Sequence, residues 1–541
     1  MPANLPILSM IAFSPLLGVL VLLFLRGDRG RLIKTVGIVT TLIPLVLAAW
    51  LYVDYNYQGD PLQYKEQLDW IKVPLNHEGI QQEITQFFFE FKYSLAVDGI
   101  SLPLVFLTAL ISSMAALASV YIKKRWKTYF ILFLLLEMGM FGVFMAQDLF
   151  LFFLFFEITL VPMFFLIGIW GYMNREQAAN RFLLYNGLGS AIMLIAFLIL
   201  VTTAGFNQVP SQTEVIFYYS GDIHTIAHNL LQAPEAYVNQ SGMPFFMSQT
   251  MKWTVFIMLL VAFGIKLPIF PFHTWMLKVH TEAPPAVVMI HSGILLKMGA
   301  YGLIRFGILF FPAEAQQWAW VLALLGVINI VYGALLAMVQ KDFKLVLAYS
   351  SISHMGIVLL GLAAFNIAGL QGAVFQLISH GLISALMFLL VGSIYERTET
   401  TQLDRLGGLA RNIPFISGIL LIGGMASLGL PGLSGFISEF LAFVGLFETH
   451  RVYAIVGTLG IIFAAVYVLR GVLNITFGPQ QPSLLQQGMR DARLIEAVPM
   501  ITLVAFILLL GVYPSVLSQP LQQTIGSLDQ LIHSVAGKIG G

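Results

Sequence analysis

Long runs of apolar residues, separated by short polar segments, recur along the whole chain. A helix needs about 20 apolar residues to cross the hydrocarbon core of a membrane. Measured against that length, the pattern predicts fourteen spans, near residues 6–25, 34–53, 99–122, 128–146, 149–172, 179–204, 251–278, 284–310, 317–339, 345–364, 369–394, 413–443, 452–476 and 495–517. The predicted fold class is therefore an all-α, polytopic membrane protein.

Composition agrees with this prediction and excludes several classes of protein. Hydrophobic residues make up 58% of the 541 residues and charged residues only 10%, whereas a soluble domain carries roughly 25% charged residues. The net charge of +1 argues against a nucleic-acid-binding protein. The chain has no cysteine, so disulfides, Fe–S clusters and thiolate zinc sites are excluded in this chain.

The distribution of basic residues predicts the orientation, because cytoplasmic loops carry the excess of Lys and Arg. Most Lys and Arg residues fall in alternate loops, whereas residues 205–250 contain none. With an even number of spans, this places both termini outside. No basic residue precedes the first apolar run, so we expect residues 6–25 to be a retained span rather than a cleaved signal peptide. The two long outside loops, 54–97 and 205–250, carry apolar patches and are expected to pack on the membrane surface.

A weak internal repeat is visible in the order of the spans. The first predicted repeat covers residues 128–310 and the second covers 317–476, with five spans in each; an odd number makes the second copy inverted. The remaining segments are 1–127, which has three spans and the outside loop 54–97, and 477–541, which has a helix and a tail. In each repeat the fourth span is interrupted by proline, at Pro268 and at Pro431. Such broken helices in inverted repeats point to an ion path.

Ionisable residues within the spans are the functional candidates, because a charge at mid-membrane costs roughly 2.5–3.5 kcal/mol. We single out Glu157, Lys266, Lys297, His354, His380 and Glu439 as a proton path, with Glu137 and Arg470 as secondary candidates. Histidine suits such a path because it titrates near neutral pH. Each residue also has a structural alternative: a neutral carboxylic acid or histidine in a hydrogen bond, a structural ion pair, or a side chain that snorkels to the surface. His273 and His280 lack a carboxylate companion and the spacing of a metal site, and no phosphate-binding loop or nucleophile motif appears.

One block of sequence is specific enough to indicate a family. Residues 266–284 read Lys-Leu-Pro-Ile-Phe-Pro-Phe-His-Thr-Trp-Met-Leu-Lys-Val-His-Thr-Glu-Ala-Pro, and residues 294–302 read Ile-Leu-Leu-Lys-Met-Gly-Ala-Tyr-Gly. This block resembles the antiporter-like membrane subunits of complex I, the proton-pumping NADH:quinone oxidoreductase. Phe156-Glu157 with Leu160-Val-Pro-Met163, and Ser353-His354-Met-Gly356, resemble further blocks of that family.

The resemblance implies fourteen core spans and a role for each candidate. Glu157 corresponds to the carboxylate paired with the first membrane lysine, Lys266, and Lys297 to the second lysine. His354 and His380 correspond to the central relay, and Glu439 to the terminal residue in the second broken helix. The L-type and N-type subunits carry lysine where this chain has Glu439, so the chain resembles the M-type subunit.

The resemblance also implies partners and a location. The expected partners are the other membrane subunits of complex I, including its L-type and N-type subunits, within a lipid bilayer. No cofactor is expected in this chain; NADH, FMN, Fe–S clusters and quinone would be bound by other subunits. The expected location is the bacterial plasma membrane, with a thylakoid membrane as the alternative. An Na⁺/H⁺ antiporter subunit and a membrane-hydrogenase subunit remain as alternatives of the same fold. A structural spacer that moves no ion is the third alternative. The buried charges argue against it, because apolar residues would hold a scaffold together without the cost of burying charge.

Overall fold

In the computed structural model, the described residues are 5–75, 84–210, 215–479 and 489–539. Thirteen helices among them are long and apolar enough to cross a membrane. They are α1 (Ile7–Phe24), α2 (Gly30–Asp54), α3 (Ser101–Ala118), α4 (Trp126–Met145), α5 (Leu149–Trp170), α6 (Arg175–Thr203), α8 (Gln249–Lys266), the helix Pro285–Ile308, α13 (Ala319–Val339), α14 (Phe343–Ala363), α15 (Ile367–Thr398), α18 (Arg451–Phe477) and α20 (Leu494–Val512).

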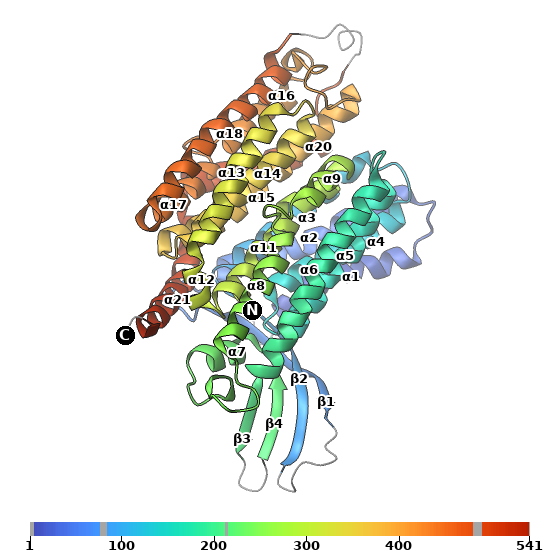
Figure 1. The fold of residues 1–541 in the computed structure, drawn as a ribbon. Coiled ribbons are helices and arrows are strands. Elements are labelled where there is room, and N and C mark those ends of the chain that lie inside the picture. Colours follow the sequence, from blue (N-terminus) through green and yellow to red (C-terminus); the bar gives the residue numbers. More distant parts are fainter. Residues whose placement is uncertain (1–4, 76–83, 211–214, 480–488, 540–541) are drawn as a thin grey trace.

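The remaining predicted span, 413–443, is divided between two shorter helices. These are α16 (Pro414–Ser427) and α17 (Ser434–Thr449), and a turn separates them. The short helices α7 (Ile223–Leu231), α9 (Thr274–Glu282) and α12 (Pro312–Gln317) lie in the connections. The prediction of an all-α membrane fold is confirmed for the bundle, and Figure 1 shows its long helices running roughly side by side.

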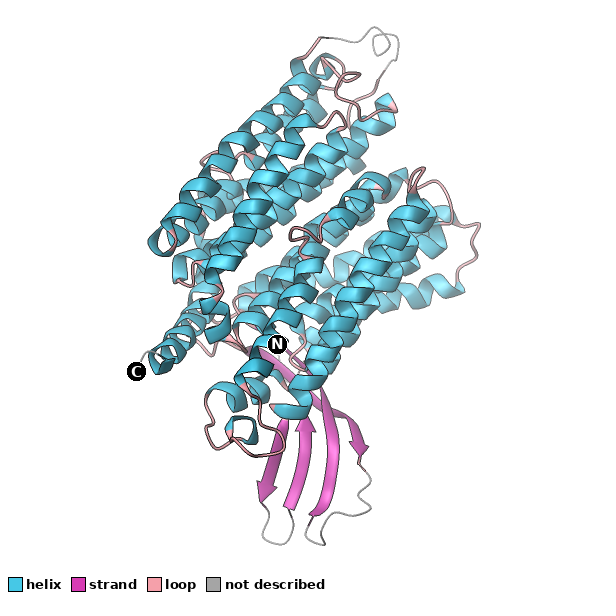
Figure 2. Ribbon diagram, viewed as in Figure 1, coloured by secondary structure: helices cyan, strands magenta, loops and turns pink. Residues whose placement is uncertain are grey.

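The two long loops supply the strands of a small sheet, which the sequence did not predict; that the loops pack on the membrane surface stays a prediction. Its strands are β1 (Gln63–Pro74), β2 (Ile84–Val97), β3 (Phe206–Pro210) and β4 (Val215–Ser220), in the order β1-β2-β4-β3. The parallel pairing of β2 with β4 joins the two loops. Figure 2 shows the sheet extending beyond one end of the bundle. We call that end the sheet side, and the end with most of the basic loops the basic side.

Aromatic side chains and charge pairs explain why these loops form strands. Phe87 of β2 packs against Tyr219 of β4 with ring centroids 5.1 Å apart, and Phe206 of β3 packs against Phe217 at 5.4 Å. On β1, Lys72 pairs with Glu90 of β2 at 3.3 Å between Nζ and Oε1. Such cross-strand pairs stabilise a sheet by roughly 0.2–1 kcal/mol each.

The tail contains a second helix that follows the predicted last span. Helix α21 (Ser515–Ile539) buries Leu517, Leu521, Ile525, Leu528 and Ile532, which are three or four residues apart and therefore share one face. The start of α1 and helix α21 lie on the sheet side (Figure 1), which is the arrangement that an even number of spans requires.

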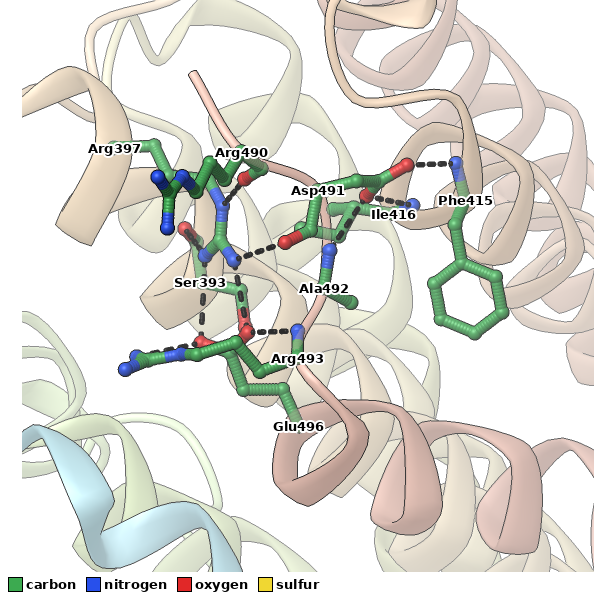
Figure 3. A network of polar contacts seen from close by, with 9 residues as sticks. All are labelled: Ser393, Arg397, Phe415, Ile416, Arg490, Asp491, Ala492, Arg493 and Glu496. Atoms are coloured by element: carbon green, nitrogen blue, oxygen red, sulfur yellow. Dashed lines mark hydrogen bonds and ion pairs between the residues drawn. The ribbon is translucent and has the colours of Figure 1, made fainter. Parts of the chain in front are cut away.

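A buried ion-pair network ties three segments together on the basic side (Figure 3). Arg397, near the end of α15, donates from Nη2 to Glu496 Oε2 at 2.8 Å and from Nε to the Arg490 carbonyl at 2.7 Å. Asp491 accepts hydrogen bonds from the backbone N–H groups of Phe415 and Ile416 at the start of α16. The network thus fixes the ends of α15, α16 and α20 relative to one another.

We expect Arg397→Ala to destabilise the protein by about 1.5–3 kcal/mol, because the buried Glu496 carboxylate, which is 1% exposed, loses one of its two arginine partners and keeps its contacts with Arg493. The measurement is thermal unfolding in detergent. Arg490→Ala is the matched control, since Arg490 is exposed and contributes its backbone carbonyl, which alanine keeps. Equal unfolding temperatures for the two variants would contradict this account of the network.

Candidate functional site

The first broken helix stops at Lys266, and one backbone and two side-chain hydrogen bonds satisfy backbone groups at the break. Pro268 has no N–H to donate to the Gly264 carbonyl; the N–H of Ile269 donates to that carbonyl instead, at 2.9 Å. Asn329 of α13 accepts from the N–H of Phe270 at 2.8 Å. The Trp275 indole donates to the Ile265 carbonyl at 3.1 Å. Specific hydrogen bonds therefore stabilise the break, which leaves Lys266 at the end of α8.

Lys266 is buried, with 2% of its surface exposed. Its ammonium lies 5.0 Å from the centroid of the Phe156 ring and 5.6 Å from that of Phe182. Glu157 follows Phe156 on α5 and is half-buried, and its Oε1 has no hydrogen-bond partner in the described part of the chain. Among the described residues, no carboxylate lies within 4.0 Å of the Lys266 ammonium. The structure brings Glu157 and Lys266 to one site without joining them in an ion pair.

Lys297 lies at the centre of an irregular helix and is fully buried. Two π-helical stretches, His291–Leu295 and Leu303–Ile308, flank the segment α11 (Leu296–Gly302) that carries it. π-helical turns often occur at functional sites. The Lys297 ammonium donates to the Ser292 carbonyl at 2.5 Å and is 2.7 Å from Nδ1 of His380. The predicted second lysine thus contacts the predicted relay directly.

From His380 the polar chain continues to the second broken helix. The rings of His380 and His354 have centroids 5.4 Å apart, and His354 Nδ1 is 3.6 Å from Glu439 Oε1. Gln376 contacts the same His354 nitrogen at 3.2 Å and accepts a hydrogen bond from Ser438 at 2.5 Å. Lys297, His380, His354 and Glu439 therefore form a nearly continuous line of groups that can carry a proton.

The turn between α16 and α17 depends on glycine. Gly429 and Gly432 have φ angles of 69° and 91°, in the left-handed region that favours glycine. Glu439 lies on α17 just after this turn and, together with Gly429, lines a cavity of about 760 Å³. The second break thus places the last carboxylate of the line beside open space.

The two secondary candidates lie apart from this line of contacts. Glu137 of α4 is fully buried, and neither of its carboxylate oxygens has a hydrogen-bond partner among the residues that the structure describes. Arg470 of α18 is exposed and donates to the Met338 carbonyl at the end of α13. Arg470 is thus held at a helix end, and no hydrogen bond or ion pair connects Glu137 with the Lys297 line among the described residues.

Sequence reasoning missed a buried histidine pair near the two lysines. His280 Nε2 and His291 Nδ1 are 2.9 Å apart, and both side chains are fully buried. The ring of His291 is 6.0 Å from that of Phe182, which also packs near the Lys266 ammonium. His291 precedes Lys297 by six residues on the same helix. The available signal was that both histidines fall within or between the two diagnostic sequence blocks.

Taken together, these groups define a class of protein: a polytopic membrane subunit with two broken helices and a buried line of titratable side chains. Residues 146–464 match the family described as NADH:quinone oxidoreductase/Mrp antiporter, transmembrane. The chain belongs to that family, which confirms the resemblance drawn from its sequence.

Relatives and solved structures agree with this assignment. The chain is 37% identical to "NAD(P)H-quinone oxidoreductase chain 4 1" of Synechococcus sp. JA-2-3B'a(2-13), covering 99% of this chain and 94% of that protein. It is 35% identical to "NADH-quinone oxidoreductase subunit M" of Rhodobacter capsulatus, covering 98% of each. A chain of respiratory complex I from Thermus thermophilus has a TM-score of 0.79 at 26% identity, covering 97% of this chain and 99% of that one. A chain of the Mrp complex from Dietzia sp. shares the fold, with a TM-score of 0.76 at 21% identity and coverage of 97% and 99%.

Proposed function

We propose that this chain is the M-type, proton-translocating subunit of a bacterial NADH:quinone oxidoreductase. The observation that carries the proposal is the line of contacts from Lys297 through His380 and His354 to Glu439. Each of these groups can take up and release a proton, and the line crosses the buried interior between the two broken helices. Quinone reduction elsewhere in the complex would supply the energy.

In this proposal, protons enter the line at the first broken helix. Lys266 is buried, and among the described residues no carboxylate lies within 4.0 Å of its ammonium. A movement of Glu157 toward or away from Lys266 would favour the lysine in its charged or its neutral state. The His280–His291 pair offers a bridge from Lys266 toward Lys297. Opening and closing of the Glu157–Lys266 contact would thus drive the proton along the line.

The redox groups belong to other subunits in this proposal. NADH, FMN, Fe–S clusters and quinone would bind there, and the L-type and N-type antiporter-like subunits would be neighbours in the membrane. The complex would lie in the plasma membrane, with the sheet side and both termini outside. The predicted inverted repeats, 128–310 and 317–476, would place the two broken helices in related positions.

An experiment on the transported ion tests this function against Na⁺/H⁺ exchange. The complex that contains this chain is purified and reconstituted in liposomes, and NADH-driven proton uptake is followed with a pH-sensitive dye at 100 mM and at nominally zero Na⁺. A proton-translocating subunit predicts equal initial rates in both solutions. If proton uptake stops in the absence of Na⁺, the result would favour Na⁺/H⁺ exchange and contradict the proposal.

A further inference from the structure

Gln376 is a buried amide beside the last step of the proton line. It lies on α15, four residues before His380, so the two side chains share one face of that helix. Its side chain contacts His354 of α14 and Ser438 of α17, and 2% of its surface is exposed. Ser438 immediately precedes Glu439, whose carboxylate faces the same histidine. The amide therefore lies where His354 and Glu439 meet.

Two side chains compete for one ring nitrogen of His354. Nδ1 is 3.2 Å from Gln376 Nε2 and 3.6 Å from Glu439 Oε1. An amide N–H can only donate, so in this arrangement Nδ1 accepts and the imidazole is neutral. The ring proton is then on Nε2, which lies 3.3 Å from the Ser427 hydroxyl. A charged ring would need the opposite arrangement, because its Nδ1–H group requires an acceptor.

The Ser438 hydroxyl allows Gln376 to provide that acceptor by turning its amide over. The hydroxyl donates to Gln376 Oε1 at 2.5 Å, and the Gly435 carbonyl is a second acceptor 2.9 Å away. Because a hydroxyl both donates and accepts, it can donate to Gly435 instead and accept an N–H from Gln376. The turned amide then points Oε1 at Nδ1 of His354. In both orientations, Gln376 and Ser438 keep hydrogen-bond partners for their buried groups.

We infer that Gln376 is a positioning residue that turns with the protonation state of His354 and thereby controls the proton step to Glu439. When the ring is charged, Gln376 presents Oε1 to the Nδ1–H group. In the step, the Nδ1–H bond breaks and an O–H bond forms on Glu439, which leaves a neutral imidazole and a carboxylic acid. Gln376 then turns an N–H group to the free Nδ1 and opposes return of the proton. The inference rests on the proposed function and adds a control of its last step.

The test is the initial rate of NADH-driven proton uptake per assembled complex in liposomes, measured in H₂O and in D₂O for wild type and Gln376→Met. Methionine has a similar length but neither an N–H nor a carbonyl group, so uptake should fall about tenfold. The ratio of the rates in H₂O and D₂O should also rise above the wild-type ratio, because transfer from His354 to Glu439 becomes rate-limiting. A slower rate with the wild-type ratio, or an unchanged rate, would overturn the inference.

Ser379→Ala is the matched control, because it removes another buried hydrogen bond between α15 and α17. Ser379 Oγ and Ser434 Oγ are 2.8 Å apart, and both side chains are buried. This variant loosens the same pair of helices and leaves Gln376 and its partners in place, so it should keep the wild-type isotope ratio. Equal rises of that ratio in Ser379→Ala and Gln376→Met would show a general effect of helix packing and overturn the inference.

A second variant keeps the inference testable if Gln376→Met does not assemble, which NADH oxidation with an artificial electron acceptor reports. Ser438→Ala keeps the amide but removes its reversible partner, so it should raise the isotope ratio as Gln376→Met does. Lys297→Met is measured for proton uptake in the same preparation. Full uptake by Lys297→Met would contradict the proposed function itself. Loss of uptake in Lys297→Met, together with the wild-type isotope ratio in Gln376→Met and Ser438→Ala, would overturn only the inference on Gln376.

Discussion

Replacing Lys297 by methionine should reduce NADH-driven proton uptake by about tenfold or more, since removing a positioned proton-transfer group typically costs 10²–10⁴-fold in the step that it serves. Methionine approximates the length of the side chain but cannot bridge the Ser292 carbonyl and His380. The measurement is proton uptake in liposomes, divided by the rate of NADH oxidation with an artificial electron acceptor, which reports the amount of assembled enzyme.

Lys341→Met is the matched control for this substitution. Lys341 is an exposed lysine on the basic side, three residues before Lys344. The same chemical change there should leave proton uptake within about twofold of wild type, because exposed substitutions away from a site have small effects. Equal losses in Lys297→Met and Lys341→Met would show that the effect does not arise from the buried line.

Replacing Lys266 should reduce proton uptake by a similar factor. Comparing Lys266→Ala with Lys266→Arg separates a proton-transfer role from a purely electrostatic one. Lys266→Ala removes both the charge and the exchangeable proton, so proton uptake should fall about tenfold or more. Lys266→Arg keeps the charge, but a guanidinium does not lose its proton in proteins. If Lys266 passes protons on, Lys266→Arg should be as inactive as Lys266→Ala.

Recovery of proton uptake in Lys266→Arg would contradict a transfer role and leave an electrostatic one. Both variants should assemble, because the Lys266 side chain makes no hydrogen bond or ion pair within the described residues and contacts the rings of Phe156 and Phe182. Assembly is read from NADH oxidation with the artificial acceptor in the same membranes.

The sequence was sufficient to predict the helical bundle, because each span needs a long apolar run and few charges interrupt those runs. It was not sufficient to predict the sheet. The strands come from two loops more than 100 residues apart, and the pairing of Phe88 with Tyr218 depends on a register that neither loop specifies alone. The second helix of the tail was also missed, because α21 is amphipathic and too polar to resemble a span.

For the candidate site, the rarity of buried charge identified the residues but not their contacts. Lys297 and His380 are 83 residues apart and meet because α11 packs against α15. The Glu157–Lys266 ion pair, expected from the resemblance, is open in the structure. The roles of all six path residues stay predictions. The His280–His291 pair escaped notice because a single histidine in a span carries little information until its partner is known.

If the buried groups act in series as one path, a double-mutant cycle of Lys297 and His380 will show it. Proton uptake per NADH oxidised is measured for Lys297→Met, for His380→Phe and for the double variant. Groups that serve the same path are strongly non-additive. The double variant should therefore be no slower than the slower single variant. If the two losses multiply, Lys297 and His380 act independently and the proposed line is contradicted.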